Sequence, residues 1–537
     1  MAVGVSDVER LARLLCLGCD SATYQVGDNQ LTPQNATCVT RMLQSSNGQE
    51  VVNMVIEYSV QGVTAKQEAL VFAVAMCARQ RVDPATRTYC YDNLCEICRT
   101  PTQLFLFINY CLTPGWSDEY PQIRWGRAFR EAISRWYLRF MEVPNGARLL
   151  AEHVTKYGRR HGWRHQGVLR MAHPKAGPSD GCGVAAVLKY IAKGLNEAEQ
   201  DLQATDANVL QYLQAVEAVK AQNNPETLDT GDLAERIRQH KLVREHVSTR
   251  LLHLPPIWEA LLEHMPMTAM IRNLGKMSAI GILDPGSQNE VTIITRLGDI
   301  HRLEDARIHP FNVLLARLTY QRGRGDEGSI RWVPNEAISN ALDSAFYETF
   351  TFMHPTRNKR FLLALDESAA MFQGSVNGCR SVHAATAAAA MVLVTARTEE
   401  HCEIVSFSRD VRPSDIQPEM TLPQAENAMR RVPGGETDCT QPIQYALQRY
   451  ESPQHRQFDV IVIYTANIPD RPQLSPAAVM QDYRRQAKLP DAKLVVCAMK
   501  SNGFTIADPD VPNMLNVVGF DAYAPEVIRR FVNGELM

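Results

Sequence analysis

The sequence has no run of apolar residues long enough to cross a membrane. Its longest strongly apolar run lies near Thr386–Ala396, about half of what a bilayer-spanning helix needs. The first residues, MAVGVSDVERLARLL, lack the basic and apolar regions of a signal peptide. We therefore expect a soluble protein of the cytoplasm without membrane contact, with the nucleus left open as a second compartment.

The chain also lacks an excess of charge of one sign. Its formal net charge is −3 and its pI is about 6.5, which excludes a protein that binds nucleic acid through global basicity but leaves a local basic face open. Hydrophobic residues make up 45% and charged residues 21%, as in ordinary globular proteins. This composition excludes a collagen, a coiled-coil rod and a mainly disordered chain. A length of 537 residues allows about three domains.

The motifs of several enzyme classes are missing. The chain has no P-loop and no H-E-x-x-H, and no G-x-S-x-G surrounds Ser368. Its 13 cysteines are an odd number in a chain without a signal peptide, so reduced thiols are favoured over a disulfide framework. Cys16/Cys19 and Cys95/Cys98 have the C-x-x-C spacing of zinc ligands. They lie in helical patterns, however, so core packing is favoured over zinc.

Helical patterns fill the chain before Pro355, and strand patterns are nearly absent there. Apolar residues recur at i, i+3, i+4 and i+7 in a succession of short segments. Examples are Lys66–Gln80, Pro101–Leu112, Arg124–Phe140 and Ile257–Met265. A long run of short helices joined by short loops indicates stacked helix pairs, an α-solenoid, rather than one compact bundle.

The pattern changes near Pro355, where continuous apolar strands begin to alternate with helices. Such strands indicate a parallel sheet covered on both faces, as in a doubly wound α/β domain. The sequence therefore predicts a multidomain protein with a helical region over 1–356 and an α/β domain over 357–537. The predicted strands are Arg360–Asp366, Cys402–Ser408, Phe458–Thr465 and Ala492–Met499, and the predicted helices are Ser381–Ala396, Pro476–Ala487 and Pro525–Val532.

Charge is unevenly distributed along the chain. Residues 121–194 hold 14 Lys and Arg against four Asp and Glu, whereas Glu197–Glu235 holds nine acids and one lysine. The densest stretch is Thr155–Lys175, in which Tyr157 and Trp163 are interleaved with the cations. Cations neutralise phosphates and flat aromatic rings stack on unpaired bases, so nucleic acid is the favoured partner. Charge alone does not exclude two alternatives, an acidic protein partner and a solvated helix face without a ligand.

The end of the first predicted strand carries part of a cation-binding pattern. Ligands bind at the carboxyl ends of strands in this fold, and Asp366 and Ser368 would present a carboxylate and a hydroxyl there. Thr437, in a later loop, would add a second hydroxyl. The second serine and the late aspartate that complete such a site are Ala370 and Ala466 here. We therefore expect at most a weakened Mg²⁺ site, and a vestigial site is the favoured interpretation.

The helical array, the α/β domain and a series of short motifs together resemble the TROVE family of SS-A/Ro ribonucleoproteins. The resemblance covers almost the whole chain, and the motifs occur in the family's order. They are TKYxxRxGWxH (Thr155–His165), KLVREH (Lys241–His246), RNLGKM (Arg272–Met277), ARIHPF (Ala306–Phe311), GGETDC (Gly434–Cys439) and SNGFTIADPD (Ser501–Asp510).

The resemblance implies a closed ring of HEAT-like helical repeats whose ends are bridged by a von Willebrand factor A-like domain. It also implies that small noncoding Y RNAs bind the outer, basic surface and that single-stranded 3′ ends of misfolded RNAs enter the ring. The implied role is RNA quality control and Y RNA stabilisation. The positions that match the family's RNA-binding residues are Lys156, Arg160 and His173, together with Arg124, Arg127 and Arg130 of the Arg-rich helix.

The chain departs from the family at the cation site. Ala370 and Ala466 replace ligands there, and GGETDC has one residue more than the family's GGTDC. This departure leaves the RNA-binding interpretation untouched and weakens the expectation of a metal-linked protein partner. We expect a monomeric, non-enzymatic RNA-binding protein. The alternative is a protein-interaction scaffold, in which the helical repeats and the A-like domain both bind protein partners.

Overall fold

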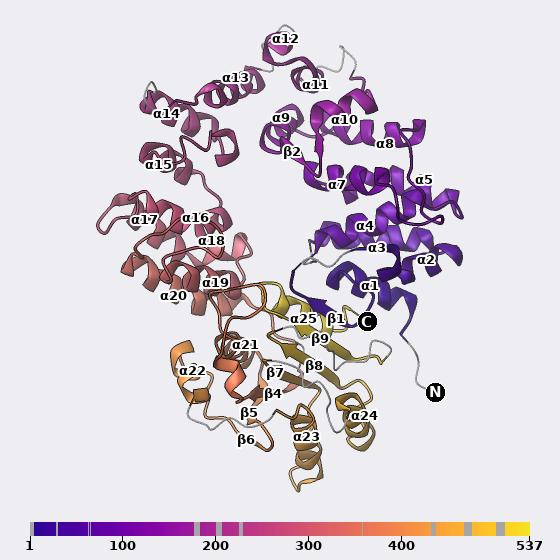
Figure 1. The fold of residues 1–537 in the computed structure, drawn as a ribbon, viewed down its shortest axis with the longest axis vertical. Helices are drawn as coiled ribbons and strands as arrows, with labels where there is room; N and C mark the ends of the chain where they lie inside the picture. The colour runs from indigo at the N-terminus through magenta and orange to yellow at the C-terminus, as the bar shows by residue number, and fades with distance from the viewer. Residues whose placement is uncertain are drawn as a thin grey trace. The chain divides into compact units, whose positions relative to one another are not determined.

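The computed structural model describes residues 5–27, 31–62, 64, 66–176, 183–199, 207–224, 229–356, 358–430, 437–466, 475–500 and 511–536. They fall into two compact units (Figure 1). The first unit comprises residues 1–30, 267–279 and 283–537, and the second comprises residues 31–266 and 280–282. The division at 356/357 predicted from sequence patterns stays a prediction, and residue 357 lies outside the described residues.

The second unit is built from helices that pack against their neighbours along the chain. α4 is almost wholly buried and packs against α3, α5 and α7. Later pairs are α8 with α10, α9 with α11, and α14 with α15. The helices are α2 (Thr37–Gln44), α3 (Gly48–Gln61), α4 (Gln67–Arg79), α5 (Pro84–Asp92), α6 (Leu94–Ile97), α7 (Pro101–Leu112), α8 (Arg127–Leu138), α9 (Gly146–Lys156), α10 (His165–Ala172), α11 (Val184–Lys193), α12 (Leu195–Glu199), α13 (Ala207–Ala221), α14 (Thr230–His240) and α15 (Pro255–Glu263).

Local sequence signals set the start of α7. Pro101 occupies its first turn, and Thr100 and Gln103 form a capping box in which each backbone N–H donates to the other's side chain, at 3.0 and 3.4 Å. This satisfies N–H groups that a helix start leaves without partners. The predicted helix at Pro101–Leu112 is confirmed, whereas the helix predicted over Arg124–Phe140 begins later, at Arg127 after Gly126.

Arg79, at the end of α4, is buried and fixes the loop that leads towards α8. Its guanidinium donates to the carbonyl oxygens of Tyr110 at 2.5 Å, Thr113 at 2.8 Å and Tyr120 at 2.7 Å. It also lies 4.1 Å from the centroid of the Trp116 ring. Burial lowers the pKa of Arg79. The carbonyl oxygens replace the water that this buried cation has given up.

The described strands of the first unit form a seven-stranded sheet in the order β1-β9-β8-β7-β4-β5-β6. Neighbouring strands are parallel except for β5 and β6. The strands are β1 (Thr23–Gln25), β4 (Arg360–Asp366), β5 (His401–Phe407), β6 (Val411–Pro413), β7 (Val460–Thr465), β8 (Lys493–Ala498) and β9 (Met514–Val518). The predicted parallel sheet is confirmed.

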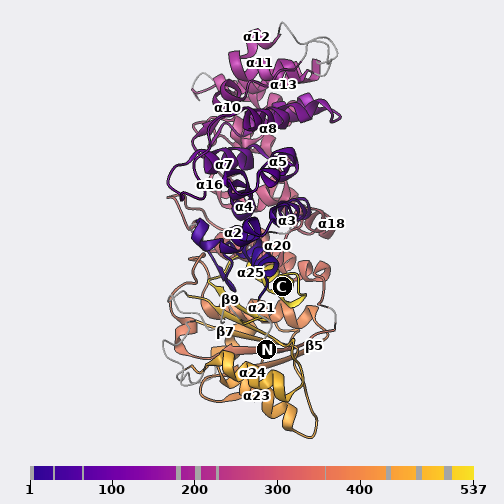
Figure 2. The same ribbon diagram turned by 90° about the vertical axis from the view of Figure 1, so that its right-hand side faces the viewer.

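Helices cover both faces of this sheet. Figures 1 and 2 show α23 and α24 on one face and α21 and α25 on the other. Apolar side chains of α23 and α24 share one core with alternate residues of the central strands. The helices are α21 (Ala384–Thr398), α22 (Leu422–Arg430), α23 (Gln441–Glu451), α24 (Pro476–Gln486) and α25 (Ala524–Val532). The first unit also contains α1 (Asp7–Leu17), α16 (Met267–Ala279), α17 (Gln288–Leu297), α18 (Ile300–Asp305), α19 (Pro310–Gln321) and α20 (Glu336–Glu348).

Three strands of the sheet, β1, β6 and β9, were not predicted from the sequence. β1 comes from the N-terminal part of the chain and pairs in parallel with β9. The Tyr24 hydroxyl donates to Asp521 Oδ2 at 2.8 Å beside this pair. A three-residue strand has no periodicity that a sequence pattern could reveal. Its pairing covers an edge of β9 that would otherwise expose backbone donors and acceptors.

Candidate nucleic-acid interface

A short β-hairpin links α9 to α10 and carries several exposed cations. β2 (Arg159–Arg160) pairs in antiparallel register with β3 (Trp163–Arg164). Both residues of the turn, His161 and Gly162, have positive φ angles of 48° and 80°, as a type I′ hairpin turn requires. This tight turn leaves the hairpin short and fixes the directions of its side chains. Its exposed cationic and histidine side chains are Arg159, Arg160, His161 and Arg164.

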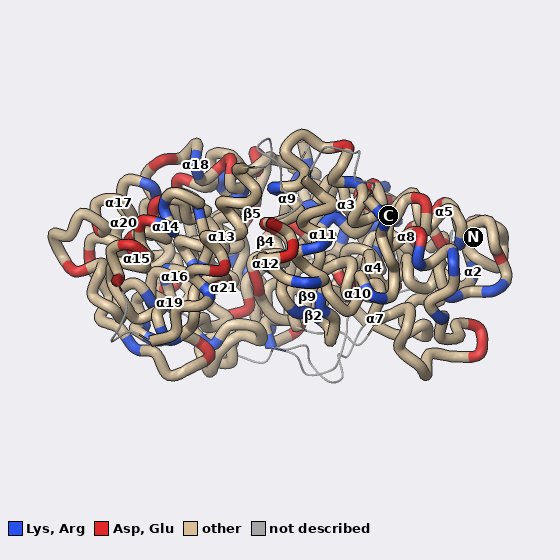
Figure 3. Tube along the Cα trace, turned by 90° about the horizontal axis from the view of Figure 1, so that it is seen from above, with Lys and Arg blue, Asp and Glu red and all other residues tan. Residues whose placement is uncertain are grey.

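Two tryptophans attach the hairpin to the start of α8. The rings of Trp163 and Trp125 meet edge to face with 5.9 Å between centroids, and Trp125 packs likewise on Phe129 at 5.1 Å. α10 packs on α8, where the Ser134 hydroxyl donates to the Ala172 carbonyl at 3.0 Å. We call the resulting surface, residues 124–130 and 156–175, the basic region. Figure 3 shows Lys and Arg in blue around α9 and β2.

Most cations of the basic region form no ion pair with a residue that the structure describes. Arg127 is paired, with an exposed i,i+4 ion pair to Glu131 at 2.8 Å. In a chain of net charge −3, a local group of cations without counter-ions among the described residues attracts a polyanion. Eight side chains have no ion pair with any described residue: Arg124, Arg130, Lys156, Arg159, Arg160, Arg164, Arg170 and Lys175.

Other arginines of the same charge-rich segment have structural partners instead. Arg135 pairs with Asp92 at 3.0 Å. Arg139 donates to the carbonyl oxygens of Cys95 at 2.7 Å and Arg99 at 2.8 Å. Arg148 pairs with Glu152 at 2.8 Å and lies 3.7 Å from the centroid of the Tyr212 ring. These cations hold helices together, so they add little to the field outside the protein.

The structure places the predicted RNA-binding residues on adjoining elements of the basic region. Lys156 ends α9, and its ammonium lies 5.4 Å from the centroid of the Tyr157 ring. Arg160 lies on β2 and is exposed. His173 ends α10 in the left-handed conformation (φ 52°, ψ 52°), which exposes its imidazole beyond the helix. Their role in RNA binding stays a prediction.

The interleaved aromatic and histidine side chains divide between core and surface. Trp163 and Tyr157 are half-buried, and the Trp163 ring packs edge to face against Trp125. His165 Nδ1 lies 2.9 Å from the Tyr137 hydroxyl, and burial lowers the pKa of His165 to about 3. Burial likewise lowers the pKa of His153. His161 and His173 are the exposed histidines of this segment.

The predicted cation-site residues lie together at the carboxyl edge of the sheet. Asp366 ends β4, and the Thr437 hydroxyl lies 3.1 and 3.2 Å from its two carboxylate oxygens. The Thr465 hydroxyl donates to Oδ2 at 2.7 Å, and the Ser368 backbone N–H donates to Oδ1 at 2.8 Å. The Asp366 carboxylate is thus held by protein donors. Residues 431–436, 467–474 and 501–510, which include parts of the family motifs, lie outside the described residues.

A lysine occupies the same edge of the sheet. Lys500 follows β8, and its backbone N–H donates to the Ala466 carbonyl at 2.9 Å. Its ammonium donates to the carbonyl oxygens of Ala370, at 3.1 Å, and Gln373. An ammonium repels a second cation, and Mg²⁺ requires near-octahedral oxygen coordination. The residues present therefore fit a divalent cation poorly.

Thr465 and Lys500 were not predicted as members of this site. Both stand at or directly after the carboxyl end of a buried strand. The rule that ligands gather at these strand ends was the signal that could have found them. Across the ranges that the structure describes, no group of three or more His, Cys, Asp or Glu could hold a metal ion.

Comparisons with known proteins agree with this architecture. The sequence model of the TROVE domain matches residues 1–319, and that of the Ro60 vWA domain matches residues 360–532. The chain is 31% identical to RNA-binding protein RO60 of Caenorhabditis elegans, over 99% of this chain and 89% of that protein. It is 32% identical to RNA-binding protein RO60 of Deinococcus radiodurans, over 99% of this chain and 94% of that protein.

A solved structure extends the likeness to three dimensions. The crystal structure of the Deinococcus radiodurans RO (RSR) protein matches with a TM-score of 0.85 at 31% identity, covering 99% of this chain and 100% of that one. The predicted fold class, a helix-rich TROVE region followed by a von Willebrand factor A domain, is confirmed. No helix within the described ranges is long and apolar enough to span a membrane. The chain belongs to the TROVE family of Ro60 proteins.

Proposed function

We propose that this protein binds RNA through the basic region and catalyses no reaction. The observation that carries the proposal is the group of eight cations without an ion pair to any described residue, on three adjoining segments of a chain with net charge −3. Phosphates are the natural counter-ions of such a group. Relatives named RNA-binding proteins, matched along almost the whole chain, support RNA as the polyanion.

The ligand proposed for the basic region is a small noncoding Y RNA. A folded RNA presents its phosphates in a fixed array, and cations set on helices and a tight hairpin match such an array better than cations on loose loops. The family's motif at Thr155–His165 supports this choice. We further propose that single-stranded 3′ ends of misfolded RNAs enter a ring of HEAT-like repeats, in a cytoplasmic role of RNA quality control and Y RNA stabilisation.

The A domain is proposed to work without a divalent cation. Its strand-edge carboxylate, Asp366, is held by hydroxyl and backbone donors, and Lys500 brings an ammonium to the carbonyls of Ala370 and Gln373. Metal-dependent capture of a partner's carboxylate therefore has no support at this site. This favours an RNA-binding protein over the alternative of a scaffold that docks proteins through its A domain.

Binding of a Y RNA to the full chain across a salt series tests the proposal. If all eight cations neutralise phosphates, the logarithm of the affinity should fall with the logarithm of the salt concentration with a slope of about −6 to −7, and fewer neutralised phosphates give a proportionally smaller slope. We expect a slope steeper than about −3. A flat salt dependence, or no measurable binding at low salt, would favour the scaffold alternative.

A further inference from the structure

The segment 331–335, which leads into α20, is fixed at two points. At the first, Trp332 donates its backbone N–H to the Gly323 carbonyl at 3.0 Å and its indole N–H to the Tyr320 carbonyl at 2.9 Å. Its ring lies against α16, where a Cβ atom at Gly275 would come within 2.7 Å of three ring carbons. Glycine at position 275 therefore makes room for the indole, which holds this end of the segment.

Asn335 is the second fixed point. Its side-chain amide donates to the Leu283 carbonyl at 3.0 Å and to Glu290 Oε1 at 2.7 Å. Its backbone N–H donates to the Tyr320 hydroxyl at 3.1 Å, and its side-chain oxygen caps the start of α20. The backbone on both sides of Val333 is therefore held in place by neighbouring elements.

Val333, between these two points, is 87% exposed. Pro334 follows it, which favours an extended backbone at Val333. Neither the backbone N–H nor the carbonyl of Val333 has a hydrogen bond with any residue that the structure describes. An apolar side chain and two backbone groups, held rigidly at the surface, suit the docking of an extended peptide. Main-chain hydrogen bonds would supply affinity, and the fixed segment would lose little conformational freedom.

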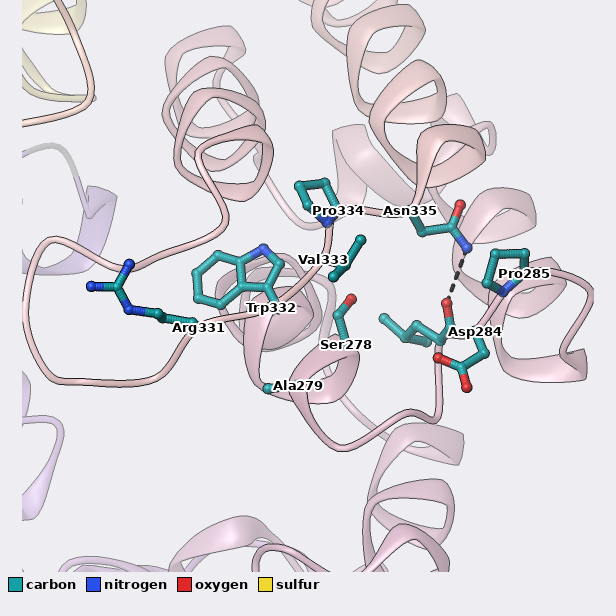
Figure 4. Close-up of a pocket in the computed structure, with 10 residues that line it drawn as sticks. Ser278, Ala279, Asp284, Pro285, Arg331, Trp332, Val333, Pro334 and Asn335 are labelled. Atoms are coloured by element: carbon teal, nitrogen blue, oxygen red, sulfur yellow. Dashed lines mark hydrogen bonds between the residues drawn. The ribbon is translucent and has the colours of Figure 1, made fainter.

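A pocket of about 510 Å³ opens beside Val333 (Figure 4). Figure 4 shows the Trp332 ring at one end of the pocket and Asp284 at the other, whereas Arg331 lies beyond the indole and points away from the pocket. The apolar walls include Ala279, Leu283, Pro285 and Pro334. The pocket is therefore suited to an apolar side chain.

Asp284 gives one end of the pocket a negative charge. It is exposed, and its carboxylate has no hydrogen bond or ion pair with a described residue. Glu336, the first residue of α20, is exposed as well and has no ion pair within the described part of the chain. An acidic end beside apolar walls is complementary to a basic side chain that stands next to an apolar one.

We propose that the segment 331–335 and this pocket dock an extended peptide segment of a partner protein. An apolar side chain of the peptide enters the pocket, and a neighbouring lysine or arginine pairs with Asp284. Val333 packs against the peptide and pairs with its main chain. A nucleic acid fits this pocket less well, because the Asp284 carboxylate repels phosphates. The inference goes beyond RNA binding, since it assigns a protein ligand to a surface of the first compact unit, outside the basic region.

The probe is a library of short random peptides displayed on phage and selected on the full chain. Peptides that also bind Ala279→Trp are removed, because this substitution fills the pocket from an exposed position. The peptides that remain should share an apolar residue with an adjacent lysine or arginine. Recovery of no peptide that depends on the pocket would overturn the proposal, as would a set rich in aspartate and glutamate.

The peptide selected most often is then synthesised, and its affinity is measured by fluorescence polarisation. Asp284→Lys should weaken binding at least about tenfold and should bind better a copy of the peptide with glutamate in place of the basic residue. Val333→Ser should also weaken binding, because apolar contact area is lost. The matched controls Asp118→Lys and Val82→Ser, at exposed positions outside the site, should bind the peptide as wild type.

The remaining outcomes separate this proposal from the proposed function. Wild-type affinity of Asp284→Lys for the selected peptide would contradict the docking site, and displacement of the peptide by single-stranded RNA would show that a nucleic acid is the occupant instead. Val333→Ser and Ala279→Trp should keep wild-type affinity for Y RNA, because they lie outside the basic region. Failure of the wild-type protein to bind Y RNA would refute the proposed function and leave the peptide measurements valid.

Discussion

The carboxyl edge of the sheet predicts a protein whose stability does not depend on Mg²⁺. Asp366 already accepts hydrogen bonds from Thr437, Thr465 and Ser368, and Lys500 places an ammonium at the same edge. If the dissociation constant exceeds the Mg²⁺ concentration tenfold, linkage gives a stabilisation of about 0.06 kcal/mol. At about 2–4 °C for each kcal/mol, the melting temperature should then rise by well under 1 °C.

The assay is thermal unfolding of the full chain in EDTA and in low-millimolar Mg²⁺. The full chain is needed because β1, from the N-terminal part, completes the edge of the sheet. Ala370→Ser with Ala466→Asp and Lys500→Ala restores two oxygen ligands and removes the ammonium, so its melting temperature should rise by several degrees in Mg²⁺. Adding Asp366→Asn to that variant should abolish the rise. Wild-type protein melting several degrees higher in Mg²⁺ than in EDTA would refute the reasoning.

Two further predictions concern stability. Burial lowers the pKa of His165 to about 3 and that of His246 to about 4 in the folded protein. Below pH 6.5 the unfolded chain therefore binds more protons than the folded protein. Each histidine should then remove about 1.4 kcal/mol of stability per pH unit, until the pH reaches its folded-state pKa. Urea unfolding between pH 7 and 5 should show this decrease in stability, and the decrease should be shallower in His246→Gln. Equal pH dependence of stability in the variant and the wild type would contradict the prediction. Arg79→Met should cost about 3 kcal/mol or more, because three carbonyl oxygens would be left without their donor. The control, Arg81→Ala at an exposed position, should change the free energy of unfolding by no more than about 0.5 kcal/mol. An equally small change for Arg79→Met would show that Arg79 does not hold the loop.

Sequence patterns predicted the part of the fold that depends on local periodicity. β4 and β7 are buried along almost their whole length, so they appear as continuous apolar runs. β1 joins the sheet from some 490 residues away in sequence, and its three residues carry no periodic signal. The start of α8 was predicted three residues early because Trp125 is apolar and packs on Phe129 from outside the helix.

The candidate sites show the same division between local and distant information. Charge counting located the basic region because its cations are close together in sequence. It could not separate Arg139, which donates to carbonyls of Cys95 and Arg99, from Arg160, since those partners lie about 40 residues away. Lys500 was likewise hidden, because its contact with the Ala370 carbonyl exists only after the strands have assembled.

The central claim is that the basic region binds RNA, and the measurement that tests it most directly is the salt-dependent affinity of a double variant for a Y RNA. Lys156→Ala with Arg160→Ala should weaken binding by about 1–3 kcal/mol and reduce the salt slope by about one for each phosphate that the variant no longer neutralises. Arg236→Ala with Arg485→Ala, which removes equal charge from exposed ion pairs outside the region, should bind as wild type. A folded Lys156/Arg160 variant with wild-type affinity at low salt would contradict the account.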